Sequence, residues 1–203
     1  MSRALKTAAF GALARSAKAL AHPHRFELLH LLEQSPRDVD TLARGSERTV
    51  ASTSQHLQVL ARAHLVTRSR EGTRVVYALA PGVADLLQHL EAVALARDPE
   101  LRMVREDWLA DHPAVALAPL AEVDGLVATG DAVLIDVRPE AEFAHGHRPG
   151  ARSVPLPQLA HRMAELPLDR EIVAVCRGRW CTWADEAVEA LVAAGFRARR
   201  LDG

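Results

Sequence analysis

The hydrophobic periodicity of this chain changes between its two halves. Up to about residue 110 the apolar residues recur every three to four positions, which is typical of amphipathic helices. From about residue 120 short apolar runs alternate with helical patterns, which indicates an α/β structure with a mainly parallel sheet. A chain of 203 residues is long enough for two small domains. We therefore predict two domains, residues 1–110 and 120–203, joined by a linker at residues 111–119.

Composition places the chain among globular proteins. Hydrophobic residues make up 49% of the sequence and charged residues 25%, which excludes a fibrous or wholly disordered chain. No run reaches the roughly 20 apolar residues that a membrane-spanning helix needs. The apolar stretch Thr7 to Ala14 is followed by Arg15 without a cleavage pattern. We therefore expect a cytoplasmic protein without a membrane partner.

The net charge of −1 conceals a difference between the two halves. Residues 1–80 carry 12 basic and 6 acidic residues, a net charge of +6, whereas residues 81–203 carry a net charge of −7. A basic domain suits binding to a polyanion such as DNA, but chance sampling of a solvated surface also produces such differences. Charge alone therefore leaves nucleic-acid binding open.

The first 80 residues contain the elements of a winged helix-turn-helix. Two helical patterns, a short third helix and a turn at Gly45-Ser46 lead to a helix expected at residues 49–63. Two β-rich runs around a glycine-containing turn follow, which predicts a hairpin at residues 65–79. This order of elements predicts a mainly α domain in which the β-hairpin forms the wing.

The helix at residues 49–63 carries the side chains that a DNA recognition helix needs. Short hydroxyl and amide side chains reach base edges and phosphates in the major groove without blocking entry. The candidate DNA contacts on this helix are Thr49, Ser52, Thr53, Ser54, Gln55, His56 and Gln58. Three arginines of the hairpin, Arg68, Arg70 and Arg74, flank its turn, where they would neutralise phosphates.

The recognition helix contains the run Ser54-Gln55-His56-Leu57-Gln58-Val59-Leu60, followed by Ala63-His64-Leu65-Val66 and the wing residues Arg70-Glu71-Gly72. On these motifs, residues 20–80 resemble the ArsR family of winged-helix repressors. The resemblance implies a homodimer that binds double-stranded DNA at an imperfect inverted repeat and leaves it when an inducer arrives. It also implies a dimer contact formed by the first helix, Leu5 to Leu20, and by the helix after the wing, Val83 to Ala96. Leu86, Leu87, Leu90 and Val93 supply the apolar face of the second of these helices.

Three positions depart from the pattern of this family. Glu47 and Arg48 stand where relatives usually carry Gly and Leu, and His64 stands where a Gly often ends the recognition helix. We expect local adjustment at these positions and an unchanged fold. Residues 38–48 contain no Cys, so the cysteine metal site of metal-sensing members is absent. We predict no metal ligands in this chain.

The two cysteines of the chain, Cys176 and Cys181, lie in one loop. The apolar run Ile172 to Val175 predicts a strand before this loop, and a helix is expected from Thr182. Amide groups at a helix N-terminus bind anions and lower the pKa of a thiol. The loop also contains Arg177, Gly178 and Arg179, which supply positive charge and tight backbone curvature. Cys176 is therefore a candidate thiolate nucleophile.

Four motifs occur in order after residue 120: Leu134-Ile135-Asp136-Val137-Arg138, Glu142-Phe143, Gly146-His147-Arg148-Pro149-Gly150-Ala151 and Cys176-Arg177-Gly178. On these motifs, residues 120–203 resemble a rhodanese domain that is short at its C-terminus. The resemblance implies that Cys176 carries sulfur as a covalent persulfide, with no other cofactor, while Asp136 and Arg138 organise the base of the site. Cys181 occupies a position where the family commonly has Arg, and this second thiol is able to attack the persulfide.

Three functions fit these features. The first is a DNA-binding transcriptional regulator, a repressor, whose rhodanese domain senses or transfers reactive sulfur through Cys176. The second is a sulfurtransferase that moves sulfur from thiosulfate or a thiol persulfide to a small acceptor and regulates its own operon through its DNA-binding domain. The third is a thiol-based sensor of As(III) or a soft metal, for which two thiolates leave at least one ligand to be found.

Overall fold

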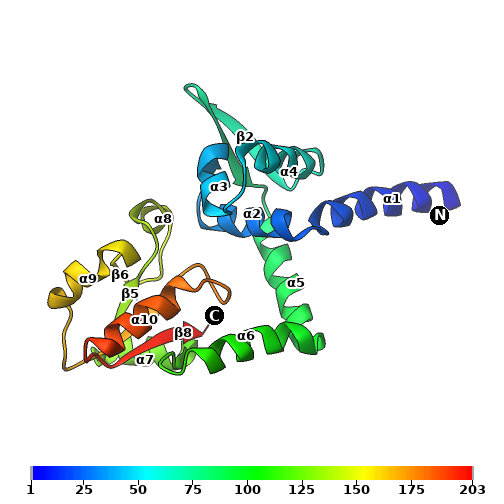
Figure 1. Ribbon diagram of the computed structural model, residues 1–203. Coiled ribbons are helices and arrows are strands. Elements are labelled where there is room, and N and C mark those ends of the chain that lie inside the picture. Colours follow the sequence, from blue (N-terminus) through cyan, green and yellow to red (C-terminus); the bar gives the residue numbers. More distant parts are fainter. Residues whose placement is uncertain (1, 203) are drawn as a thin grey trace. The chain divides into compact units, whose positions relative to one another are not determined.

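A computed structural model describes residues 2–202 of the chain (Figure 1). The chain forms two compact units, and the division lies between Ala92 and Val93. Each unit has a buried hydrophobic core of its own. Within residues 2–202, none of the helices combines the length and the apolar character that crossing a membrane requires.

The first unit consists of helices and one small sheet. Its helices are α1 (Arg3–Leu20), α2 (Pro23–Gln34), α3 (Val39–Gly45), α4 (Val50–Arg62) and the first part of α5 (Val83–Arg97). Its strands are β1 (Arg37–Asp38), β2 (Val66–Glu71) and β3 (Arg74–Leu79). Strand β3 lies between β1 and β2 and is antiparallel to both, so β2 and β3 form the predicted hairpin. The predicted winged helix-turn-helix is confirmed.

The core of the first unit is formed by leucines that recur at helical spacing. Leu28 and Leu29 of α2, Leu42 of α3, and Leu57 and Leu60 of α4 are all fully buried and belong to one cluster. Because Leu57 and Leu60 turn one face of α4 toward this core, the opposite face of α4 is directed to solvent. The packing of three helices thus determines which side chains α4 can offer to another molecule.

In the described residues 93–202, the second unit contains the end of α5, five further helices, two short 3-10 turns and five strands. The helices are α6 (Pro99–Asp111), α7 (Leu120–Thr129), α8 (Glu140–His145), α9 (Leu159–Arg162) and α10 (Trp183–Ala193), and α9 is flanked by the turns η1 (Leu156–Gln158) and η2 (Met163–Glu165). The strands are β4 (Leu117–Pro119), β5 (Ala132–Asp136), β6 (Arg152–Ser153), β7 (Glu171–Val175) and β8 (Ala198–Asp202). They form one sheet in the order β4-β8-β7-β5-β6, and every neighbouring pair is parallel, which confirms the predicted α/β fold.

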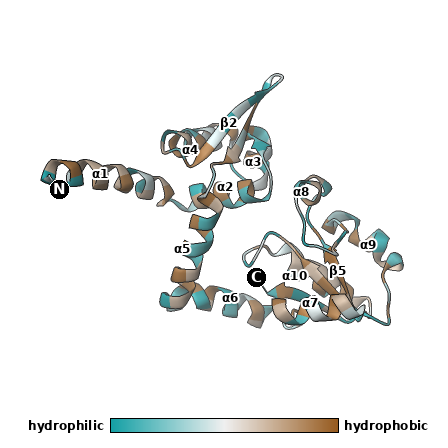
Figure 2. Ribbon diagram, turned by 180° about the vertical axis from the view of Figure 1, so that it is seen from behind, coloured by the Kyte–Doolittle hydropathy of each residue, from teal (hydrophilic) through white to brown (hydrophobic). Residues whose placement is uncertain are grey.

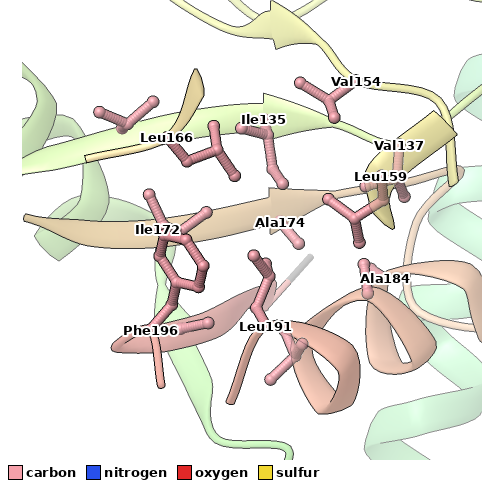
Figure 3. Close-up of a cluster of buried hydrophobic side chains, with 14 of the residues drawn as sticks. Ile135, Val137, Val154, Leu159, Leu166, Ile172, Ala174, Ala184, Leu191 and Phe196 are labelled. Atoms are coloured by element: carbon pink, nitrogen blue, oxygen red, sulfur yellow. The ribbon is translucent and has the colours of Figure 1, made fainter. Parts of the chain in front are cut away.

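Both faces of this sheet are covered, as is usual for parallel sheets. On one face Ile135 and Ile172 pack in the same cluster as Leu191 of α10 (Figure 3). On the other face Leu134 packs in a cluster with Val123 of α7. Since successive side chains of a strand point to opposite faces, every residue of β5 is buried. The strand ends and the loops that follow them are consequently held in place by two separate layers of core.

The structure differs from the prediction at the start of the second unit. Residues 117–119, placed in the predicted linker, form β4 and pair with β8. Helix α6 belongs to the second unit, so the division lies earlier than the predicted boundary at residue 110. Helix α6 has no fully buried side chain. Its contacts with the unit are partly polar, and hydrophobic periodicity does not register such contacts.

Two of the departures from the family pattern coincide with an unusual backbone conformation. Glu47 has a φ of 52° and His64 has a φ of 57°, both in the left-handed region. Glycine adopts this region readily, whereas a Cβ atom makes it unfavourable. The fold is kept at both positions, as predicted, with two residues in a conformation that favours glycine.

His64→Gly should stabilise the first unit. The substitution removes the cost of a Cβ atom at positive φ, and a smaller loss from the freer unfolded chain opposes this gain. We expect the free energy of unfolding to rise by about 0.5 to 1 kcal/mol in urea denaturation followed by circular dichroism. His64→Ala keeps the Cβ atom and is the matched control, which should show no such gain. Equal stability of the two variants would contradict the prediction.

Candidate functional site

The predicted DNA contacts of α4 differ in their exposure. Thr49 is the N-cap of the helix, and its hydroxyl accepts a hydrogen bond from the Ser52 amide at 3.2 Å. The exposed members are Thr49, Gln55 and Gln58, and the partly exposed members are Ser52, Ser54 and His56. These six side chains form the polar surface of α4 that remains available for base edges and phosphates.

Thr53 does not belong to this polar surface. It is fully buried, because it shares the inward face of α4 with Leu57 and Leu60. These positions lie three to four residues apart, which places them on one side of a helix. The predicted DNA contact by Thr53 is therefore wrong, and Thr53 is part of the interior.

A cluster of three histidines joins α4 to the start of α2. The ring of His56 lies 4.4 Å from the ring of His22 and 4.8 Å from the ring of His24, measured between centroids. Burial, together with the neighbouring His22, His24 and Arg25, lowers the pKa of His56 below its usual value. His56 is thus held by α2 and has less freedom than its exposed neighbours. In the part of the chain that the structure describes, no group of three or more His, Cys, Asp or Glu side chains is arranged to hold a metal ion.

The wing presents the three predicted arginines to solvent. Arg68, Arg70 and Arg74 are exposed on the two strands that flank Gly72. The Arg70 Nε donates to the Gly72 carbonyl at 3.2 Å, and an Arg74 amino group donates to Asp38 at 3.2 Å while the Arg74 side chain stays 75% exposed. The three cations therefore lie on the exposed hairpin, where phosphate contact is sterically open.

The cysteine loop, residues 176–182, connects the carboxyl end of β7 to α10. Cys176 and Cys181 are joined by a disulfide, with their Cα atoms 6.2 Å apart. Gly178 has a φ of 96°, and its carbonyl accepts a hydrogen bond from the Cys181 amide at 3.2 Å. Glycine allows the chain to reverse here, so that two cysteines five positions apart meet.

Arg177 is paired within the second unit. Its Nε and an amino group donate to the two carboxylate oxygens of Glu142 in α8, at 2.9 and 2.7 Å. Its guanidinium also lies 4.3 Å from the ring centre of Trp183, at the start of α10. Glu142 is only 2% exposed. Arg177 was expected to add positive charge to the loop, but this buried carboxylate neutralises much of that charge.

Asp136 and Arg138 lie together at the end of β5, next to the start of the cysteine loop. The Arg138 Nε donates to Asp136 at 2.9 Å, and the Arg138 backbone amide donates to the same carboxylate at 3.0 Å. An Arg138 amino group also donates to the Gly146 carbonyl at 2.8 Å. The Val137 amide, between the two residues, donates to the Val175 carbonyl just before Cys176 at 3.0 Å. The pair thus holds the strand end on which the loop begins.

A second ion pair, Asp185 with Arg200, supports the middle of the cysteine loop. Asp185 of α10 is completely buried and Arg200 of β8 is 2% exposed. One amino group of Arg200 donates to both Asp185 oxygens at 2.7 and 2.9 Å, and the other donates to the carbonyls of Gly178 and Arg179 at 2.7 and 2.8 Å. Burial alone would raise the pKa of Asp185, but hydrogen bonds from Arg105 and Arg200 outweigh it and hold that pKa below its usual value.

Sequence reasoning missed three of these groups, Glu142, Asp185 and Arg200, as members of the site. Asp185 stands beside Ala184 on a helix whose other inward residues are apolar, and Arg200 stands on a strand beside the buried Leu201. Charged residues inside otherwise apolar patterns are rarely buried without a partner. That rule was the available signal for the pair. The side chain of Arg179, which was predicted, pairs instead with Asp202 at 3.5 Å in a partly exposed position.

Comparison with known proteins gives matches to each half and to nearly the whole chain. Residues 120–203 match the family described as rhodanese-like domain. The chain is 38% identical over 198 residues to the HTH-type transcriptional regulator Rv0324 of Mycobacterium tuberculosis, a match that covers 97% of this chain and 87% of that protein. It is also 42% identical over 52 residues to a sulfurtransferase of Allochromatium vinosum, which covers 26% of this chain and 49% of that protein.

Among solved structures, the chain is similar to the homodimeric winged helix-turn-helix DNA-binding domain of Mb0332 from Mycobacterium bovis. The sequence identity is 35%, the match covers 49% of this chain and 92% of that fragment, and the TM-score is 0.46.

The stability of the first unit should fall in acid through His56. Its pKa is lowered from 6.5 in the folded chain, so the unfolded chain takes up a proton there at a higher pH than the folded chain does. Folding therefore loses free energy as the pH falls from about 7.5 toward the folded-state pKa. His56→Gln should flatten this fall in urea denaturation at a series of pH values. His89→Gln, at an exposed histidine of α5, should keep the wild-type slope, and a wild-type slope in both variants would refute the prediction.

Glu142→Gln should make Cys176 more reactive in the reduced protein. Glutamine can still accept hydrogen bonds but no longer neutralises Arg177, and an uncompensated guanidinium on the adjacent residue favours the thiolate. We expect iodoacetamide to alkylate Cys176 about 3- to 10-fold faster near neutral pH, followed by peptide mass mapping. Glu140→Gln, at an exposed position of α8, should leave the rate unchanged. No difference between the two variants would mean that Arg177 does not influence the thiol.

Proposed function

The chain belongs to the ArsR-type winged helix-turn-helix transcriptional regulators fused to a rhodanese domain, and we propose that it is a repressor that leaves DNA when reactive sulfur oxidises its cysteine loop. The observation that carries the proposal is the disulfide between Cys176 and Cys181, in the loop on which a rhodanese would hold sulfur. A sensor of this kind needs one part that contacts DNA and one part that changes covalently with the signal. The two units have the residues for these two tasks.

The proposed reaction starts from the dithiol form. The Cys176 thiolate attacks the sulfane sulfur of a persulfide or polysulfide, so that a persulfide forms on Cys176 and the donor leaves as a thiolate or as a polysulfide shorter by one sulfur. The Cys181 thiolate then attacks the Cys176 sulfur, which forms the disulfide and releases the extra sulfur as hydrosulfide. One sulfane sulfur is thereby reduced to sulfide and two thiols are oxidised. The two thiol protons pass to the departing donor and to the hydrosulfide.

The charges around the loop favour sensing over turnover of thiosulfate. Arg177 is paired with Glu142, and the terminal nitrogens of Arg200 donate to Asp185 and to two loop carbonyls, so neither guanidinium is free to bind a small dianion. The position five residues after Cys176 carries a thiol, Cys181, and no arginine. A neighbouring thiol converts the persulfide to a disulfide within the molecule. This outcome fits a sensor better than an enzyme that transfers sulfur repeatedly to an acceptor.

For the DNA contact we propose that α4 enters the major groove and the wing contacts the flanking backbone. The exposed amides of Gln55 and Gln58 are of the right type for base edges. The exposed guanidinium groups of Arg68, Arg70 and Arg74 would neutralise phosphates, which makes the affinity fall with salt concentration. The net charge of +6 over residues 1–80 supports the same assignment.

We propose that a second copy of the chain covers α1 and the adjacent groove. Hydrophobic residues recur along α1 (Figure 2), and Leu5, Phe10 and Leu13 are 57%, 64% and 66% exposed. An apolar groove between α1, α2 and α5 is lined by Ala17, Leu20, Pro23, Phe26, Leu86 and Leu90, among others. Leu87, which was predicted for the dimer face of α5, is buried in the core of the first unit. Exposed apolar surface of this kind is typical of an interface, and a two-fold dimer matches an inverted-repeat operator.

The alternative is a sulfurtransferase that regulates its own operon, and the partial identity to the A. vinosum sulfurtransferase favours it. Release of thiocyanate from cyanide and thiosulfate, lost in Cys176→Ser, would support this alternative. The third function, a sensor of As(III) or a soft metal, has two thiolates and no further protein ligand among residues 2–202 that completes a metal-binding group.

Cys181→Ser should separate capture of sulfur from formation of the disulfide. After treatment of the reduced proteins with polysulfide, we expect wild type to lose about 2 Da in intact mass spectrometry, Cys181→Ser to gain about 32 Da, and Cys176→Ser to be unchanged. The same samples are tested in a gel-shift assay with an operator selected from random duplexes by the reduced protein. Wild type should lose operator affinity by about tenfold or more, and Cys176→Ser should stay bound.

Two results would defeat the proposed function. One is wild-type protein that forms the disulfide and keeps its full operator affinity. The other is an equal loss of affinity in Cys176→Ser, because DNA release would then not depend on the nucleophile.

A further inference from the structure

Asp185 receives hydrogen bonds from three side chains on two different elements. Besides Arg200 of β8, it is contacted by Arg105 and Trp108 of α6. The two terminal nitrogens of Arg105 donate to the two carboxylate oxygens at 2.9 and 3.0 Å, and the Trp108 indole nitrogen donates at 3.0 Å. These four residues are called the Asp185 cluster below. The buried Asp185 carboxylate thus connects β8 with α6, whose Arg105 lies 80 residues before Asp185 in the sequence.

On the side of the loop, the cluster forms hydrogen bonds with the backbone between the two cysteines. Arg200 donates to the carbonyls of Gly178 and Arg179, which lie inside the ring closed by the disulfide. The Gly178 carbonyl also accepts the Cys181 amide. Both carbonyls therefore belong to the segment that the Cys176–Cys181 bond closes into a ring.

On the side of α6, the cluster is a large part of what holds the helix. No side chain of α6 is fully buried, and its apolar Met103 and Val104 are more than half exposed. Leu109 packs against the core of the unit, and Trp108 stacks on His112 with 4.0 Å between ring centroids. A helix with so little buried apolar surface is stabilised mainly by its few specific contacts, and it is the kind of element that opens locally.

The charge balance makes the two sides depend on each other. Asp185 supplies one negative charge, whereas Arg200 and Arg105 supply two positive charges, and the Arg105 side chain is only 11% exposed. The two loop carbonyls provide the remaining electronegative partners of Arg200. If the two carbonyls move away, the N–H groups of Arg200 that they accepted need another acceptor. Of the acceptors that Arg200 has in the structure, Asp185 then remains, and Arg200 competes for it with Arg105 and Trp108.

We propose that the Asp185 cluster transmits the covalent state of the cysteine loop to α6, an inference that rests on the proposed function. In the disulfide form the ordered loop carbonyls hold Arg200, and Asp185 keeps α6 docked. In the dithiol form the loop is less ordered, and Arg200 donates more of its hydrogen bonds to the Asp185 carboxylate. Arg105 and Trp108 then lose their acceptor, and α6 is released. Helix α6 follows α5 after Asp98 alone, and α5 carries part of the proposed dimer face. Arg105, Trp108, Asp185 and Arg200 act as positioning residues and take no part in the sulfur chemistry.

The test removes the contacts from the side of α6, because substitution of Asp185 itself would leave two arginines without a partner and endanger the fold. Arg105→Gln deletes the paired charge, and Trp108→Phe deletes only the indole donor. Arg102→Gln makes the same change of charge at an exposed arginine of α6 and is the matched control. Circular dichroism of the full chain establishes that each variant is folded, and Trp108→Phe carries the test if Arg105→Gln is not.

Two measurements are made on the dithiol form, kept with dithiothreitol, and on the disulfide form produced by polysulfide. Hydrogen exchange of the amides of residues 99–111 reports the docking of α6, and a gel shift on the selected operator reports DNA affinity. In wild type and Arg102→Gln we expect these amides to exchange about tenfold slower in the disulfide form, with the operator released. In Arg105→Gln and Trp108→Phe we expect fast exchange in both forms, and disulfide-form protein that stays on the operator.

The outcomes distinguish failure of this inference from failure of the proposed function. Equal exchange of α6 in both forms of wild type overturns the inference, and so do variants that form the disulfide and leave DNA as wild type does. In the latter case the proposed function stands. If wild type shows the change in α6 exchange but no change in operator affinity, the proposed function fails and the connection between loop and helix is upheld.

Discussion

Three buried carboxylates around the cysteine loop, each held by an arginine, are the interactions on which the geometry of the second unit depends. Asp136 binds Arg138 at the end of β5, Glu142 binds Arg177 of the loop, and Asp185 binds Arg200 of β8. A buried charge without its partner costs several kcal/mol, so the Glu142–Arg177 and Asp185–Arg200 pairs form only when the separate segments that carry them are in place. The parallel order of β5, β7 and β8 brings those segments together. The pairs contact the start and the middle of the loop, and the disulfide joins Cys176 to Cys181 around that middle segment.

This pairing has a consequence for the chemistry of the loop. Cations beside a thiol usually increase its acidity, and the sequence of the loop is rich in arginine. In the folded unit, Arg177 and Arg200 are committed to carboxylates and Arg179 is paired at the surface. Under the proposed function, we therefore expect the backbone of the loop and Cys181 to influence the reactivity of Cys176 more than a free guanidinium does. Such a site would react with reagents that attack thiols and would discriminate little on the basis of anionic charge.

Much of the fold could be predicted because it rests on apolar periodicity and on motifs of adjacent residues. Helix α4 and the hairpin of the first unit, strand β7 and the loop with both cysteines all lie where the patterns indicated them. The prediction failed where a contact joins residues far apart in sequence. Thr53 was assigned by its polarity although its position on α4 turns it inward, and β4 was assigned to a linker because its partner β8 lies at the other end of the unit. Asp185 was missed for the same reason, since its partners Arg105 and Arg200 belong to different elements.

The position of β8 within the sheet affects the order in which the chain can become structured during synthesis. β8 is the last of the five strands in sequence, yet it lies between β4 and β7. All elements of the first unit, including the β1–β3 pair, lie before Val93, so this unit can fold while the remainder is still being made. The sheet of the second unit stays incomplete until β8 has left the ribosome, and Arg200 arrives with it. A growing chain therefore acquires helix α4 well before it acquires an ordered cysteine loop.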